Sequence, residues 1–189
     1  MTRSDNISEI PPDIPIPHDD GACDHLVGLI LPRMALPTTN GSTITFAEIP
    51  ARTVIYIYPR TGRPDQQLPT GWNDIPGARG CTPQSCSFRD HYAELQQLGV
   101  AVYGLSTQDT VYQREAVDRL QLPFPLVSDE DLAFASALDL PTFEVDGMHL
   151  IKRVTLICNE GWIEHAFYPV FPPHQSAEQV IEWLRENPV

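Results

Sequence analysis

Two cysteines, Cys81 and Cys86, lie close together in the sequence with four residues between them, whereas Cys23 and Cys158 stand far away. Four cysteines placed so unevenly are too few to form a disulfide scaffold in a chain of 189 residues. A thiolate is a nucleophile that attacks both oxidants and disulfides. The close pair therefore favours redox chemistry over a structural bridge.

The residues after Cys81 predict a helix that begins at or near this cysteine. Pro83 suits a first helical turn and Gly99 supplies a stop, while apolar side chains recur between them at helical spacing, at Phe88, Tyr92, Leu95 and Leu98. The unpaired N–H groups and the positive dipole end of a helix N-terminus stabilise a thiolate. Cys81 is placed to benefit from that effect.

The segment around the two cysteines reads Gly80-Cys81-Thr82-Pro83-Gln84-Ser85-Cys86-Ser87-Phe88-Arg89-Asp90-His91-Tyr92. It closely resembles the active-site segment of the Q-type peroxiredoxins, which are also called bacterioferritin comigratory proteins. The resemblance extends roughly from residue 27 to 187, through Gly104-Leu105-Ser106, the segment 122–129 and the strand that starts at Arg153.

This resemblance implies a thiol peroxidase that reduces hydrogen peroxide or organic hydroperoxides without a metal or another cofactor. Cys81 would be the peroxidatic cysteine and become a sulfenic acid, which Cys86 would resolve by forming an intramolecular Cys81–Cys86 disulfide. A thioredoxin- or glutaredoxin-type reductant would reopen the disulfide.

The resemblance also assigns supporting residues. Arg153 matches the arginine that fixes the thiolate and polarises the peroxide, a task suited to a permanently charged donor of several oriented hydrogen bonds. Pro59 matches the pocket proline, although the loop after it is far longer than usual. The family hydroxyl three residues before the cysteine is replaced by Ala78, so Thr61 becomes the candidate hydroxyl donor.

Helix geometry constrains how Cys86 can act. Five residues along a helix rise ~7.5 Å, which separates the two Cα atoms by roughly 8 to 9 Å. A disulfide requires Cα atoms no more than about 7 Å apart. If both cysteines lie on one helix, residues 80–90 must unwind locally before the disulfide can form.

The surrounding elements predict an α/β protein with a thioredoxin-like fold, in which helices flank a mixed central sheet. Strand patterns occur at 53–58, 100–105 and 124–127, an antiparallel hairpin at 153–167, and a capped final helix after Ser176. The Asn40-Gly41 turn signal predicts an N-terminal β-hairpin.

The predicted organisation is an extended or disordered arm at 1–25, outside the core, followed by one domain at 26–189 with an inserted loop at 60–80. The arm is rich in proline and aspartate, and the loop contains four glycines and three prolines. Cys23 is expected to be an incidental thiol of the arm. Trp72 is expected to contact a substrate or partner, and Trp162 to lie in the core.

The formal charge of −13 and the pI of about 4.6 argue against nucleic acids and anionic membranes as partners. The sequence shows neither a signal peptide nor an apolar run of membrane-spanning length, so a cytoplasmic protein is expected. Relatives occur as monomers and as homodimers, and either state is open here.

Other functions compete with the peroxidase. His91 near the cysteines suggests a metal site, but no second ligand pair has zinc-site spacing. A disulfide exchange protein would carry Cys-x-x-Cys, which this chain lacks. The alternative function is a redox sensor that keeps the Cys81/Cys86 switch with little peroxidase turnover, and a third is a module with inert core thiols.

Overall fold

The computed structural model describes residues 6–189. The strands are β1 (Leu36–Pro37), β2 (Thr43–Ile44), β3 (Thr53–Ile57), β4 (Ala101–Ser106), β5 (Leu126–Ser128), β6 (Thr142–Val145), β7 (Met148–Ile151), β8 (Val154–Asn159) and β9 (Trp162–Phe167). The α-helices are α1 (Cys81–Asp90), α2 (Tyr92–Gln97), α3 (Thr110–Leu120), α4 (Ala133–Ala137) and α5 (Ser176–Glu186). Short 3-10 helices are η1 (Phe46–Glu48), η2 (Trp72–Asp74) and η3 (Pro173–Gln175).

The central sheet has five strands in the order β5-β4-β3-β8-β9. Strand β3 pairs in parallel with β4 and antiparallel with β8, so the sheet is mixed. Every residue of β3 is buried, as expected for a strand covered on both faces and rich in β-branched and aromatic side chains. The last residue of β3, Ile57, pairs with the first residue of β8, Val154. These paired strand ends position Pro59, which follows β3, and Arg153, which precedes β8.

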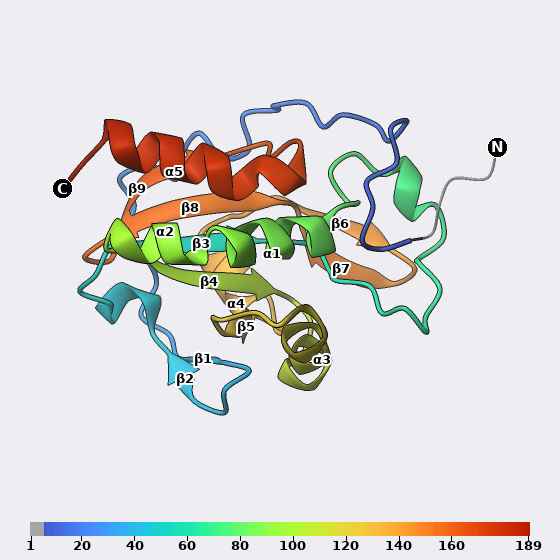
Figure 1. Ribbon diagram of the computed structural model, residues 1–189, viewed down its shortest axis with the longest axis horizontal. Helices are drawn as coiled ribbons and strands as arrows, with labels where there is room; N and C mark the ends of the chain where they lie inside the picture. The colour runs from blue at the N-terminus through green and yellow to red at the C-terminus, as the bar shows by residue number, and fades with distance from the viewer. Residues whose placement is uncertain (1–5) are drawn as a thin grey trace.

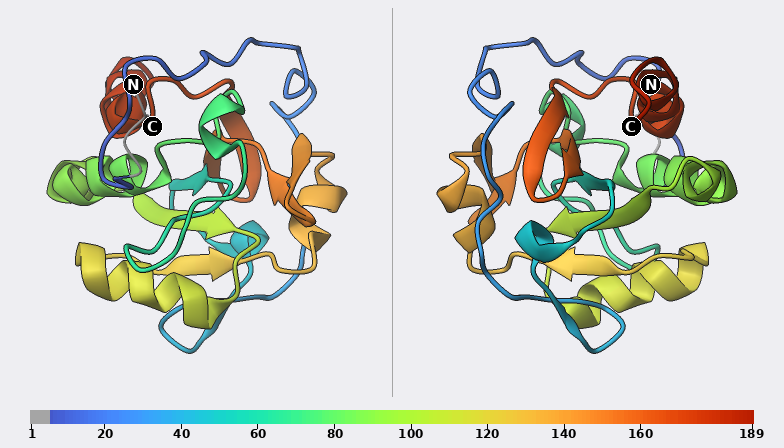
Figure 2. Two further views of the ribbon diagram at one scale, coloured as in Figure 1. Left: turned by 90° about the vertical axis from the view of Figure 1, so that its right-hand side faces the viewer. Right: turned by 90° about the vertical axis from the view of Figure 1, so that its left-hand side faces the viewer.

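Two apolar clusters cover the two faces of this sheet. Val54 and Tyr56 of β3 face the cluster that includes side chains of α1, α2, α3 and α5, whereas Ile55 and Ile57 face the cluster that includes α4. This alternation is the period of two that a strand imposes on its side chains. Figure 2 shows the same layering, with α1, α3 and α5 on one side of the sheet and α4 on the other. In Figure 1, α5 and α1 lie side by side across the front.

The thioredoxin-like architecture with a mixed sheet is confirmed, and β1–β2 is the predicted N-terminal hairpin. Two elements differ from the sequence prediction. The helix expected to run past Tyr92 breaks at His91, whose ψ of 8° separates α1 from α2. A second hairpin, β6–β7, occupies residues 142–151, where the sequence had indicated no element.

Residues 6–25, the part of the N-terminal arm that the structure describes, lie against the domain, and Cys23 enters its core. Cys23 is only 5% exposed and belongs to the cluster on the α4 face of the sheet, which corrects its expected status as an arm thiol outside the core. Figure 1 shows the arm crossing the top of the molecule toward the 60–80 loop. The arm was misjudged because Cys23 is buried in the cluster on the sheet, although Ile16 of the same arm is 62% exposed.

The two tryptophan predictions were also wrong. Trp72 is 4% exposed and packs with Ala78, Val145 and Leu150, so the 60–80 loop has a small apolar core shared with the β6–β7 hairpin. Trp162 at the start of β9 is 49% exposed, whereas its neighbour Ile163 is 1% exposed, because successive side chains of a strand point to opposite faces. Strand membership alone therefore does not predict the burial of a side chain.

Gly80 sets the start of α1. Its φ of +105° lies in the left-handed region, and a Cβ built on it would stand 2.3 Å from Cγ of Pro173. The backbone of Gly80 can therefore lie directly against η3, and this contact fixes where the helix that carries Cys81 begins. Glycine is the residue that tolerates both the dihedral angle and the close approach.

We expect Gly80→Ala to lower the free energy of unfolding by about 2 kcal/mol or more, combining left-handed strain with a clash. Gly99→Ala is the matched control, because Gly99 has a φ of +74° and a Cβ added to it would meet nothing within 4 Å. That control should lose only about 1 kcal/mol in urea unfolding followed by tryptophan fluorescence. Equal losses in the two variants would contradict the role of the Pro173 contact.

Candidate functional site

Cys81 is the first residue of α1 and is 4% exposed. Gly80, the residue before it, contributes no side-chain cap to the helix. The first-turn N–H groups of a helix lack intrahelical partners and make its N-terminus electropositive. The cysteine therefore sits where the backbone favours a negative charge, as the sequence predicts.

Arg153 reaches Cys81 from the opposite wall of the site. This arginine precedes β8 and is 3% exposed, and its Nη2 donates to the Cys81 Sγ at 3.2 Å. The same nitrogen lies 3.1 to 3.2 Å from three backbone carbonyls, those of Gly77, Ala78 and Arg79. These contacts fix the plane of the guanidinium and aim it at the sulfur.

Gln84 is a site residue that the sequence analysis did not single out. Its Oε1 accepts a hydrogen bond from Arg153 Nη1 at 2.5 Å, and its Nε2 donates to Ser176 Oγ at 3.2 Å. Gln84 is fully buried and links the arginine to the start of α5. The available signal was its spacing, because a residue three positions after Cys81 on a helix shares its face.

The other candidate residues lie in different places. Pro59 is buried two residues after the end of β3, next to Tyr58, which belongs to the same apolar cluster as Cys81. Thr61 is not brought to the cysteine, since its backbone N–H and its hydroxyl both donate to Gln108 Oε1, at 2.9 and 3.2 Å. The long loop carries Thr61 toward α3 before it returns to the site.

At the position of the missing hydroxyl, the backbone of Ala78 contacts the cysteine. Its carbonyl oxygen accepts a hydrogen bond from Cys81 Sγ at 3.6 Å and another from Arg153 Nη2 at 3.1 Å. A thiol can donate to this carbonyl but a thiolate cannot. The guanidinium favours the charged form, and charge-assisted hydrogen bonds are about twice as strong as neutral ones. The Cys81 sulfur is thus held between a carbonyl acceptor and a guanidinium donor.

The other three cysteines lie in environments that suppress ionisation. Burial raises the pKa of the half-buried Cys86 on α1 and that of Cys158 on β8. Burial, together with the nearby Asp20 carboxylate, raises the pKa of Cys23 to about 12. All four cysteines are free thiols.

Within residues 6–189, no three His, Cys, Asp or Glu side chains are grouped to hold a metal ion. None of the helices in this range is long and apolar enough to cross a membrane.

Known proteins resemble this chain over most of its length. The redoxin family profile matches residues 26–181. Peroxiredoxin Bcp of Escherichia coli strain K12 is 30% identical over 167 residues, which cover 85% of this chain and 96% of the relative. Chloroplastic peroxiredoxin Q of Oryza sativa subsp. japonica is 24% identical over 84% of this chain and 66% of its own length. The solved structure of peroxidoxin BcpB from Mycobacterium tuberculosis superposes with a TM-score of 0.70 at 20% identity, over 86% of this chain and 99% of that one.

A thioredoxin-like sheet with a buried cysteine at a helix start, hydrogen-bonded to an arginine, is the arrangement of a thiol-dependent peroxidase. The chain belongs to the redoxin family. Within that family it is a Q-type, Bcp-like peroxiredoxin, and its substrate and electron donor classes are accordingly a hydroperoxide and a thiol reductant.

The four thiols should differ in reactivity. In a short pulse of substoichiometric iodoacetamide at pH 7, we expect Cys81 to be labelled first, because Arg153 stabilises its thiolate while the other three thiols have raised pKa values. Peptide mass spectrometry gives the labelled fraction at each site.

Arg153→Gln should slow labelling of Cys81, because it removes the charged donor that contacts the sulfur. Arg89→Gln is the matched control, because Arg89 also lies on the site's helix but pairs with Asp90. Faster labelling of Cys86 than of Cys81 in the parent would contradict the electrostatic assignment.

Proposed function

We propose that Cys81 is the peroxidatic cysteine and that Arg153 is its electrostatic partner. The observation that carries the proposal is the 3.2 Å hydrogen bond from Arg153 Nη2 to the Cys81 sulfur. The thiolate attacks the terminal oxygen of the hydroperoxide, the O–O bond breaks, and the leaving oxygen takes a proton to become water or an alcohol. The product on the enzyme is a sulfenic acid.

Arg153 suits this step because its charge is fixed and its orientation is restrained. Charge moves from sulfur to the leaving oxygen during the attack, and preorganised donors stabilise such a transfer without reorganising. A relative bears on the kind of peroxide: the bacterioferritin comigratory protein of Xanthomonas campestris, whose structure has a TM-score of 0.66, was studied for alkyl peroxide reduction. Organic hydroperoxides are accordingly proposed as substrates alongside hydrogen peroxide.

Cys86 is proposed to resolve the sulfenic acid. Its sulfur attacks the Cys81 sulfur, the S–S bond forms, and the oxygen leaves as water. Both residues lie on α1, so their Cα atoms are roughly 8 to 9 Å apart in a regular helix and the first turns must unwind. Unwinding breaks the hydrogen bonds from Arg153 to Gln84, from Gln84 to Ser176 and between Ser85 and Tyr56.

A dithiol protein of the thioredoxin or glutaredoxin type is proposed to reopen the disulfide. Cys86 is the half-exposed member of the pair, so its sulfur is the one that a reductant reaches first. A cytoplasmic location, a monomeric or homodimeric state, and one domain at 26–189 remain parts of this proposal. The 60–80 loop is proposed to act as support for Arg153 through its carbonyls.

The test is peroxide consumption by the full chain with thioredoxin, thioredoxin reductase and NADPH. Cys81→Ser should abolish turnover because it removes the nucleophile. Cys86→Ser should lose steady-state turnover but still consume one equivalent of peroxide per chain. Cys158→Ala is the matched control, since this thiol is buried on β8 and is given no role in the proposed cycle; its turnover should equal that of the parent.

Several outcomes would overturn the proposal. Turnover that survives Cys81→Ser would remove Cys81 from the chemistry. Full turnover in Cys86→Ser would show that another thiol resolves the sulfenic acid. Negligible consumption by the parent with thioredoxin, with glutaredoxin and with dithiothreitol would leave the redox sensor as the better account.

A further inference from the structure

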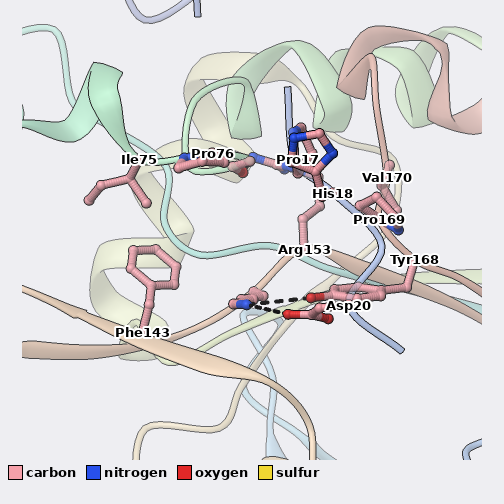
Figure 3. A pocket seen from close by; sticks show the side chains of 12 residues that line it. Pro17, His18, Asp20, Ile75, Pro76, Phe143, Arg153, Tyr168, Pro169 and Val170 are labelled. Carbon is pink, nitrogen blue, oxygen red and sulfur yellow. Dashed lines mark hydrogen bonds and ion pairs between the residues drawn. The ribbon is translucent and has the colours of Figure 1, made fainter. Parts of the chain in front are cut away.

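A cavity of about 290 Å³ opens beside Arg153. Its walls are mostly apolar, with Ile75 and Phe143 on one side and Pro169 and Val170 on the other. Figure 3 shows Arg153 rising between these two groups of side chains. The cavity is therefore an apolar space with one buried cation at its inner wall.

Arg153 connects this cavity to the reacting sulfur. Its side chain lines the cavity, and its Nη2 donates to Cys81 Sγ. Its Nε is buried and has no hydrogen-bond partner among the residues that the structure describes. A buried donor without a partner is costly, so a ligand that accepts a hydrogen bond there is favoured. The peroxide oxygens of a substrate are acceptors of this kind.

The N-terminal arm supplies the remaining wall. Pro17 lines the cavity and lies against Gly77, where a Cβ added to the glycine would stand 3.6 Å from the proline ring. The arm is attached on both sides of this point. Upstream, the backbone oxygen of Asn6 accepts a hydrogen bond from Arg79, and downstream Asp20 pairs with Lys152 at 3.1 Å.

We propose that this cavity binds the carbon skeleton of an organic hydroperoxide and that Pro17 of the arm completes its wall, so that the arm helps to set substrate preference. The inference rests on the peroxidase function proposed above. The cavity volume of about 290 Å³ is consistent with this proposal, because a dry apolar cavity of ~150 Å³ suffices to bind benzene. One aromatic ring with small substituents therefore fits, and its peroxide group would face Arg153.

The experiment compares kcat/KM for cumene hydroperoxide with kcat/KM for hydrogen peroxide, using the full chain and dithiothreitol as reductant. Ile75→Trp adds bulk inside the cavity and should lower the ratio of the two values about tenfold. Pro17→Ala removes ring carbons from the wall and should lower the ratio about threefold, through a higher KM for cumene hydroperoxide.

Pro12→Ala is the matched control, because this proline belongs to the same arm but is exposed and outside the cavity lining; its ratio should equal that of the parent. Melting temperatures confirm that each variant is folded. An unchanged ratio in Ile75→Trp overturns the cavity assignment, and an unchanged ratio in Pro17→Ala overturns the role of the arm. A parent that consumes neither peroxide refutes the proposed peroxidase function instead, so the two failures are distinguishable.

Discussion

Arg153 is a buried cation, and the arrangement of its partners dominates the site. Its hydrogen-bond acceptors in the described chain are one amide oxygen, three backbone carbonyls and the Cys81 sulfur, and no carboxylate is among them. Burying a guanidinium is unfavourable unless its charge is compensated. The cysteine is thus the one partner that can supply a full negative charge, and the guanidinium and the thiolate stabilise one another.

The need to hold the buried Arg153 guanidinium in place explains why a long loop can be inserted next to the reacting cysteine. Carbonyls of residues 77–79, at the end of the loop, hold the guanidinium, so the loop must itself be rigid. Its rigidity comes from Trp72, which is buried with Ala78 and with side chains of the β6–β7 hairpin. The backbone of Ala78 contacts both Arg153 and Cys81, which shows that the restraint on the arginine does not depend on a side-chain hydroxyl at this position.

The sequence predicted the parts of the structure that depend on local pattern. The strands before Pro59 and after Arg153 and the helix start at Cys81 follow from periodicity and from a recognisable segment. Long-range packing could not be read in this way. Gln84 joins the site because Arg153 and Ser176, 69 and 92 residues away, converge on it. Cys23 was misjudged for the same reason, because its burial depends on the sheet and not on its proline-rich neighbours.

The contacts that position Cys81 also oppose the disulfide that it is proposed to form. Gln84 and Ser85 make three hydrogen bonds that tie the first turns of α1 to Arg153, Ser176 and Tyr56. The two neutral hydrogen bonds contribute about 1 kcal/mol each and the one from the charged guanidinium about 1.5 to 3 kcal/mol, so releasing all three costs a few kcal/mol. Oxidation itself lowers that cost, because a sulfenic acid does not carry the charge that the guanidinium holds in the thiolate. The chemical step that makes the sulfur ready for attack by Cys86 therefore also weakens the interaction that keeps α1 wound.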